Sequence, residues 1–293
     1  MQIFLTHTDT PYRTFHEGDE GLHISPSALS TFDDSHVVFA FWCHHAWGDE
    51  EGWQNFLQMY QHFEVWKQRL PHHITPLLSL EDARILSGAP KRRLELLAKW
   101  GFRTITPLWR GVHSLGGAYD TDIGLTPLGV KICSIALERG IHLDISHANP
   151  RSAKEILSLS RIYGISPLAS HSNFFGLNPH PRNIDDHLAK EVAHLGGIIG
   201  ISFVPSHLGG QENLHTLLSH LDYGRKLGLE NHLVLGTDYD GTDTLPKGMQ
   251  RGVIDLHNFH SYLTQYGFSG EFLQKLFYQN AHNYFSRKKD TQT

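Results

Sequence analysis

The sequence alternates between short apolar, β-rich runs and longer stretches with helical periodicity. Most of the short runs are apolar throughout, which is typical of strands whose two faces are both covered by helices. Eight such runs occur, at residues 2–8, 36–43, 74–80, 104–108, 142–146, 166–170, 197–204 and 232–237. Eight strand–helix units in 293 residues predict a single-domain α/β fold, a (β/α)8 TIM-type barrel over residues 1–285 with a polar C-terminal tail at 286–293.

Start and stop signals delimit the helices between these runs. Thr126-Pro127 and Asn149-Pro150 each place a capping side chain before a proline at the first helical position. Asn183 is expected to cap a helix over residues 184–195, and the last helix is expected over about residues 271–285. The alternative fold is an open doubly wound sheet, but the sequence carries no GxGxxG or P-loop turn of the kind such sheets use.

Composition excludes several classes of partner. The net charge is −5, and no stripe of Lys and Arg is present, so nucleic acid is not an expected partner. No apolar run reaches the ~18 residues of a membrane span, so no membrane contact is expected. The first residues read as a strand rather than a secretory signal, and two isolated cysteines, Cys43 and Cys133, do not make a disulfide framework. A cytoplasmic protein is therefore expected, with homo-oligomer formation left open.

Metal-ligand and acid–base residues stand at the ends of five of the expected strands. In a barrel all the carboxyl ends of the strands meet at one mouth, where active sites lie. His7 and Asp9 are two positions apart, so both side chains can point into that mouth. Imidazole and carboxylate groups together suit zinc. The residues are His7, Asp9, Glu81, His147, His171 and Asp238.

These residues can be divided between two divalent ions. Glu81 has two carboxylate oxygens and can bridge the ions, while His147 and His171 can complete the second one. Two ions ~3.5–4 Å apart would hold a bridging hydroxide and polarise a carbonyl group. Each residue alone also has a simpler interpretation, as a loop hydrogen-bonder, a helix cap or part of a turn. Five separate strand ends with such residues favour the joint site.

The ordered set of motifs resembles the membrane (renal-type) dipeptidase family of binuclear zinc peptidases. The resemblance spans nearly the whole chain. It rests on HTDTP at residues 7–11, LE at 80–81, GLTPLG at 124–129, DISH at 144–147, SHS at 170–172, RN at 182–183, residues 197–203, GTDYDG at 236–241 and residues 280–285.

The resemblance implies a role for each matching residue. One zinc ion would be held by His7, Asp9 and Glu81, and the other by Glu81, His147 and His171. Arg182 would bind the carboxylate of a dipeptide substrate, and Asp238 would carry the proton of the bridging hydroxide that acts as nucleophile.

The chain departs from the family at the end of the fourth strand. Better-known members carry a histidine there that contacts the scissile carbonyl, whereas this chain has Leu108-Trp109-Arg110. Trp109 and Arg110 are therefore candidate substrate-binding residues. The expected function is a zinc metallo-dipeptidase. The alternatives are a hydrolase of another small amide or ester and a catalytically silent metal-binding barrel.

Overall fold

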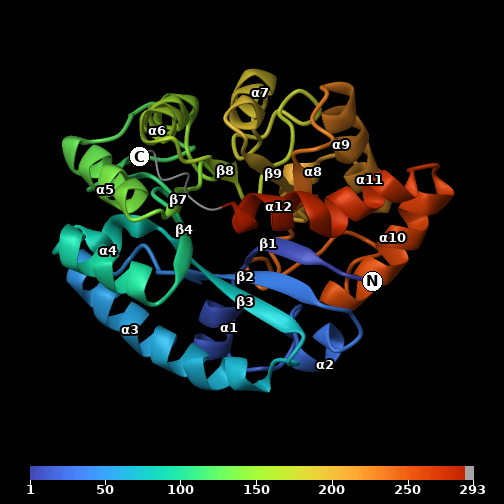
Figure 1. The fold of residues 1–293 in the computed structure, drawn as a ribbon, viewed down its shortest axis with the longest axis horizontal. Helices are drawn as coiled ribbons and strands as arrows, with labels where there is room; N and C mark the ends of the chain where they lie inside the picture. Colours follow the sequence, from blue (N-terminus) through green and yellow to red (C-terminus); the bar gives the residue numbers. More distant parts are fainter. Residues whose placement is uncertain (288–293) are drawn as a thin grey trace.

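A ring of eight parallel strands surrounded by helices forms the centre of the molecule (Figure 1). The computed structural model describes residues 1–287. In order around the sheet the strands are β7 (His142–Leu143), β4 (Phe102–Thr106), β3 (Ile74–Glu81), β2 (Ser35–Trp42), β1 (Phe4–Thr8), β10 (Leu233–Leu235), β9 (Ile198–Ile201) and β8 (Leu168–Ala169). Asp144 pairs in parallel with Leu168, and the Ile145 amide donates to the Leu168 carbonyl at 2.8 Å, which closes the ring. The predicted (β/α)8 barrel is confirmed.

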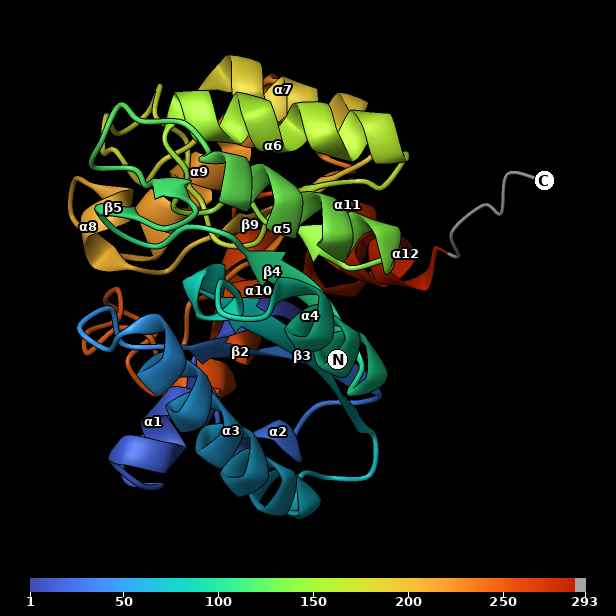
Figure 2. The ribbon, with the colours of Figure 1, turned by 90° about the vertical axis from the view of Figure 1, so that its left-hand side faces the viewer.

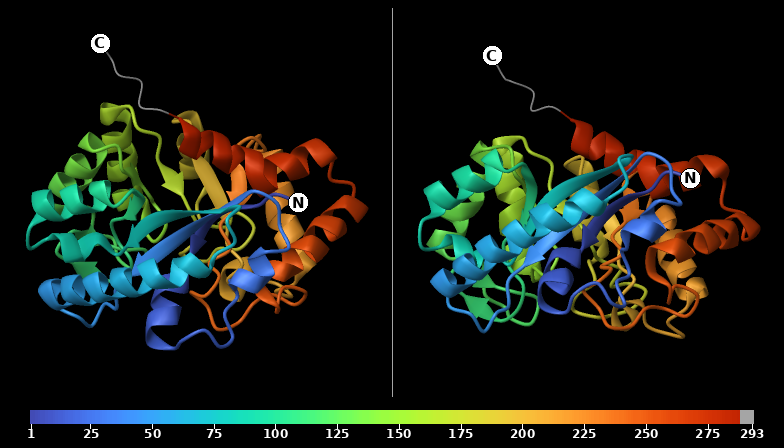
Figure 3. Two further views of the ribbon diagram at one scale, coloured as in Figure 1. Left: turned by 60° about the horizontal axis from the view of Figure 1, so that its bottom comes forward. Right: turned by 90° about the horizontal axis from the view of Figure 1, so that it is seen from below.

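Helices cover the outside of the barrel on every side, and Figure 3 shows α3 running beside β2. Among residues 1–287, no helix is both long enough and apolar enough to cross a membrane. The larger helices are α3 (Asp49–Trp66), α4 (Pro90–Lys99), α5 (Pro127–Glu138), α6 (Pro150–Tyr163), α7 (Asp186–His194), α9 (Leu214–Lys226) and α10 (Leu256–Gln265). Shorter elements are α1 (Thr10–His16), α2 (Pro26–Leu29), α8 (Pro205–Leu208), the hairpin of β5 (Val112–His113) and β6 (Gly116–Gly117), and 3-10 turns at Lys67–Arg69, Ala83–Leu86 and Gly252–Asp255.

Two predicted helix caps are confirmed and one is wrong. Thr126 accepts from the Gly129 amide, and Asn149 accepts from the amides of Arg151 and Ser152. Helix α7 is capped by Asp185, and not by Asn183. The Asn183 amide group instead donates to the carbonyls of Asn178 and His207. The next residue, 184, pairs in parallel with residue 174, so the backbone stays extended for two residues longer than predicted.

The end of the chain closes the barrel at the amino ends of the strands. Helix α11 (Gly270–Gln274), a π-helical turn (Lys275–Gln279) and α12 (Asn280–Ser286) occupy the region of the predicted last helix. Tyr284 donates to the Ser166 carbonyl at 2.7 Å, and Asn280 donates to the Leu233 carbonyl at 2.9 Å. Figure 1 shows α12 crossing the middle of the barrel. Most of the predicted polar tail, residues 288–293, lies outside the described residues.

The opposite end of the barrel is the mouth, and glycines set the spacing of the strands that lead to it. Figure 2 shows β5 and α8 at one end of the molecule and α12 at the other. A Cβ atom on Gly200 or Gly236 would lie 1.9 or 2.0 Å from the Ser170 carbonyl oxygen. Glycine at both positions therefore lets β9 and β10 pack closely against the segment that carries His171.

Candidate metal centre

The predicted ligand residues of the first group meet at the mouth, although they are far apart in the sequence. His7 is on β1, Asp9 is the first residue after β1, and Glu81 is the last residue of β3. His7 Nε2 lies 3.4 Å from Asp9 Oδ2 and 3.5 Å from Glu81 Oε2. All three side chains are buried. Their donor atoms therefore surround one small space, as an ion would require.

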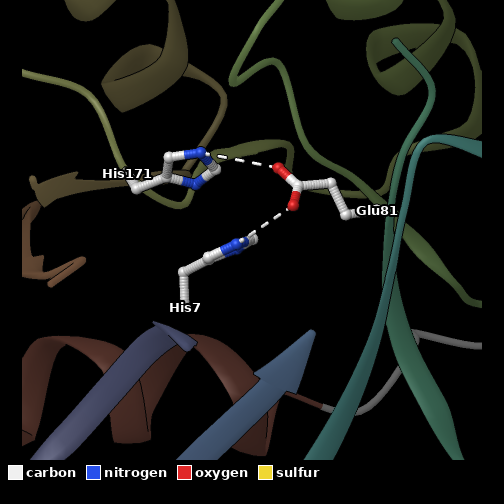
Figure 4. A group of neighbouring side chains, drawn as sticks. All are labelled: His7, Glu81 and His171. Carbon is white, nitrogen blue, oxygen red and sulfur yellow. Dashed lines mark ion pairs between the residues drawn. The ribbon is translucent and has the colours of Figure 1, made fainter. Parts of the chain in front are cut away.

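The second group lies on the other side of the same carboxylate. His147 Nε2 is 2.9 Å from Glu81 Oε1 and 3.0 Å from His171 Nε2, and His171 Nε2 is 3.6 Å from Glu81 Oε1. Figure 4 shows one oxygen of Glu81 directed toward His7 and the other toward His171. The geometry thus gives Glu81 the position of a bridge between two groups of donor atoms.

Burial and neighbouring charges shift the pKa values throughout this cluster. Burial opposes protonation of His7, but the carboxylates of Glu81 and Asp9 raise the pKa of its ring well above its usual value. Burial, with Glu81 adjacent, raises the pKa of the Asp9 carboxyl well above its usual value. Burial also opposes ionisation of Glu81, but the His7 and His147 rings lower the pKa of that carboxyl far below its usual range. Burial lowers the pKa of His171 well below its usual value and, with Arg182 nearby, lowers that of His147. Neutral imidazoles are the form that binds metal ions.

Several polar atoms of the cluster have no hydrogen-bond partner although they are buried. They are His7 Nε2 and Asp9 Oδ1, while Glu81 Oε1 has only the rings of His147 and His171 beside it. Such atoms are costly to leave unsatisfied, so their convergence needs an explanation. Divalent cations would coordinate these atoms and would also neutralise the charge of the neighbouring carboxylates. The residues present therefore fit a pair of metal ions.

Asp238 lies on the His7 side of the cluster. Its Oδ1 atom is 3.8 Å from His7 Nε2, and His7, Asp9 and Asp238 together could offer three donor atoms to one ion. The backbone at Asp238 has a φ of 59°, and that at His147 has a φ of 68°. Left-handed conformations of non-glycine residues are costly and gather at functional sites. At these two positions they occur where the chain leaves a strand and presents its side chain to the mouth.

A cleft of about 470 Å³ opens beside the cluster. Arg182, in the loop after β8, lines it with its guanidinium carbon 5.5 Å from the Tyr119 ring centroid. Arg182 is only 7% exposed, and its Nη2 atom has no hydrogen-bond partner. Burial lowers the pKa of this guanidinium, while Asp238 and Glu81 act in the opposite direction. A desolvated guanidinium with a free N–H edge is a natural binding group for a carboxylate.

The two candidate substrate-binding residues after β4 lie in different environments. Trp109 lines the cleft, and its carbonyl accepts a hydrogen bond from His147 Nδ1 at 2.9 Å. The Arg110 side chain is 59% exposed, and its Nε atom is 3.8 Å from Asp120 Oδ2. Arg110 is not among the residues that line the cleft. The structure therefore brings Trp109, and not Arg110, to the candidate site.

Among the cleft-lining residues that the sequence analysis did not single out, three lie around Arg182. Tyr119 lies under Arg182, while the rings of His180 and His207 lie 4.9 Å apart near the same guanidinium. Burial, helped by Arg182, lowers the pKa of His207 to about 2, so this ring is neutral. His180 follows β8 and His207 follows β9, so their position after a strand was the available signal. It was hidden among 23 histidines.

The family model for membrane dipeptidases, peptidase family M19, matches residues 52–292. The chain belongs to this family. An uncharacterized protein encoded in the pqqA 5′ region of Klebsiella pneumoniae is 30% identical over 204 residues, which are 64% of this chain and 73% of that protein. An uncharacterized dipeptidase of Schizosaccharomyces pombe is 27% identical over 194 residues, 62% of this chain and 45% of that protein. The family predicted from the motifs is confirmed.

Solved structures of metallopeptidases share the fold along nearly the full length of the chain. A family M19 metallopeptidase, dipeptidase AC, superposes with a TM-score of 0.88 at 22% identity, covering 98% of both chains. A metallopeptidase from Rhodobacter sphaeroides, solved with a phosphinate mimic of the dipeptide L-Ala-D-Ala, gives a TM-score of 0.87 at 21% identity over 98% of this chain and 99% of that one. At this identity the likeness establishes the barrel.

Proposed function

We propose that this protein is a binuclear zinc dipeptidase. The observation that carries the proposal is the Glu81 carboxylate, which has one oxygen toward His7 and the other toward His147 and His171. The same cleft holds the buried Arg182, whose Nη2 atom has no hydrogen-bond partner. Family membership supports metal-dependent hydrolysis of dipeptides. Zinc is proposed because the donors are imidazoles and carboxylates without thiolates, and because burial keeps the rings of His147 and His171 neutral.

The proposed division of labour follows from the positions of the side chains. Arg182 pairs with the C-terminal carboxylate of the substrate and so fixes the scissile bond relative to the cluster. When bound, the two ions supply the Lewis acidity that activates water and polarises the scissile carbonyl. Asp238, beside His7, accepts the proton released by the attacking water and delivers it to the leaving amine. Trp109 forms part of the cleft wall and holds the His147 ring through its carbonyl.

A short substrate is favoured by the dimensions of the cleft. A volume of about 470 Å³ suits a small molecule rather than a folded or extended polypeptide. The Rhodobacter sphaeroides structure contains a dipeptide mimic, which is a property of that protein and a guide to the substrates worth testing. A cytoplasmic location is part of the proposal, supported by two buried cysteines that form no disulfide.

Metal content and a panel of dipeptides test the proposal together. We expect about two divalent ions per chain by elemental analysis, and hydrolysis of LL or LD dipeptides that is lost on chelation and regained with zinc. Matched dipeptide amides serve as the control for recognition of the free carboxylate. Cleavage of other small amides or esters without dipeptides would favour the first alternative. Two bound ions without any hydrolysis would favour the silent barrel, and a well-folded protein that never holds more than one ion would rule out the bridged pair.

A further inference from the structure

The hydroxyl group of Ser170 lies behind the candidate metal centre, between two of its histidines. Ser170 follows β8 and is 2% exposed. Its Oγ atom is 2.8 Å from His171 Nδ1 and 3.3 Å from His7 Nδ1. In both rings the Nε2 atom faces Glu81, so Ser170 contacts the nitrogen on the opposite side of each ring. One side chain therefore contacts a ring from each of the two ligand groups.

The position of the single hydroxyl proton decides what Ser170 can do for these rings. Ser170 Oγ makes a short hydrogen bond to Asp144 Oδ2, and Asp144 is the acceptor in each of its other hydrogen bonds as well. Because the hydroxyl proton is donated to Asp144, the Ser170 oxygen can act only as an acceptor toward both imidazoles. Each ring must carry its hydrogen on Nδ1 and present the lone pair of Nε2 to the mouth, which is the form a metal ligand needs.

Asp144 is held rigidly enough to fix this arrangement. It is 1% exposed and follows β7, at the point where the barrel closes. Its Oδ1 atom accepts from the amides of Ser146 and Ser170, at 2.9 and 3.0 Å. Its Oδ2 atom also accepts from Thr106 Oγ1 at 3.0 Å. Ser146 Oγ lies 3.4 Å from Ser170 Oγ, a much longer contact than the one to Asp144.

We propose that Ser170, anchored by Asp144, is a positioning residue that holds His7 and His171 in the ligand tautomer and thereby couples the affinities of the two ions. The inference rests on the proposed metal centre. Neighbours of this kind that orient metal-binding histidines typically contribute 10- to 100-fold in metal affinity. The Ser170 hydroxyl contacts a ligand of each ion, so removing it is expected to weaken the binding of both ions. A separate hydrogen-bond partner for each histidine would affect only one ion.

The test compares Ser170→Ala with His171→Ala, starting from the metal-loaded protein. Chelator competition followed by elemental analysis measures how readily each ion is lost. We expect Ser170→Ala to lose both ions at roughly 10- to 100-fold lower chelator strength, with the larger effect at the ion held by His171, whereas His171→Ala mainly empties one site. Ser160→Ala is the matched control, because Ser160 in α6 is as buried as Ser170 but its hydroxyl has no hydrogen-bond partner.

A second variant separates ring orientation from loss of packing. Asp144→Asn keeps the size of the side chain, but an amide NH₂ facing Ser170 would turn the hydroxyl proton toward a ring. We expect weaker binding of both ions and an altered visible spectrum of the cobalt-substituted protein, with the fold retained. Wild-type affinity for both ions in Ser170→Ala, or weakening of the His171 ion alone, would overturn the inference. A wild-type protein that binds two ions but cleaves no dipeptide would contradict the proposed function without contradicting this inference.

Discussion

Replacement of Arg182 by alanine tests the proposed recognition of the substrate carboxylate. Arg182 is 7% exposed, and within residues 1–287 no carboxylate forms an ion pair with its guanidinium. Its charge is thus already desolvated and unpaired before substrate arrives. Removing an unpaired buried charge does not leave an orphaned partner, so the variant should fold with wild-type or higher thermal stability.

The expected loss in kcat/KM follows from the burial of the ion pair that Arg182 would form with the substrate carboxylate. Truncating one partner of a buried, hydrogen-bonded charge pair costs about 2–5 kcal/mol, which corresponds to roughly 30- to 5,000-fold in kcat/KM. We expect a value in this range for a free dipeptide, expressed mainly in KM. For the C-terminal amide of the same dipeptide, which lacks the carboxylate charge, the loss should be much smaller.

The assay is steady-state kinetics on the matched free and amidated dipeptides. Arg110→Ala is the control, because that side chain is exposed, lies near Asp120 and does not line the cleft. It should leave both substrates nearly unaffected. Equal losses on the free dipeptide and its amide in Arg182→Ala would show that Arg182 does not read the carboxylate. A large selective loss in Arg110→Ala would transfer the role to that residue.

Two further substitutions test the centre itself. Glu81→Gln should weaken the binding of both ions together, because Glu81 is the side chain that faces both ligand groups, and elemental analysis after dialysis measures this. Retention of two ions at wild-type affinity by a folded Glu81→Gln protein would contradict the bridge. Asp238→Asn should keep two ions and normal stability but lose on the order of 10²–10⁴-fold in turnover, since the amide cannot accept the proton. A near-normal kcat would end the proton-carrier role, and loss of an ion would make Asp238 a ligand.

Local patterns were enough to predict much of the architecture. Eight apolar runs separated by capped helices predict a barrel because parallel strands covered on both faces need apolar side chains throughout. The polar residues at the ends of these runs could be assigned to one mouth for the same topological reason. Caps that depend on neighbouring residues alone, such as Thr126 and Asn149, were also predicted correctly. The Asn183 cap was wrong, because the side chain is held by the carbonyl of His207 in α8 and the backbone after it pairs with residue 174 instead of entering the helix.

The sequence by itself determined the fold, the family and the proposed metal ligands that meet at the mouth, since these depend on periodicity, spacing and order along the chain. Only the tertiary structure decided how these residues meet. The placement of the Glu81 oxygens between two groups, the burial of Arg182 and the exposure of Arg110 depend on distances between side chains from separate strands and loops. The contact of Ser170 with both His7 and His171 is of the same kind. Closure of the barrel sets those distances, and no local pattern in the sequence records them.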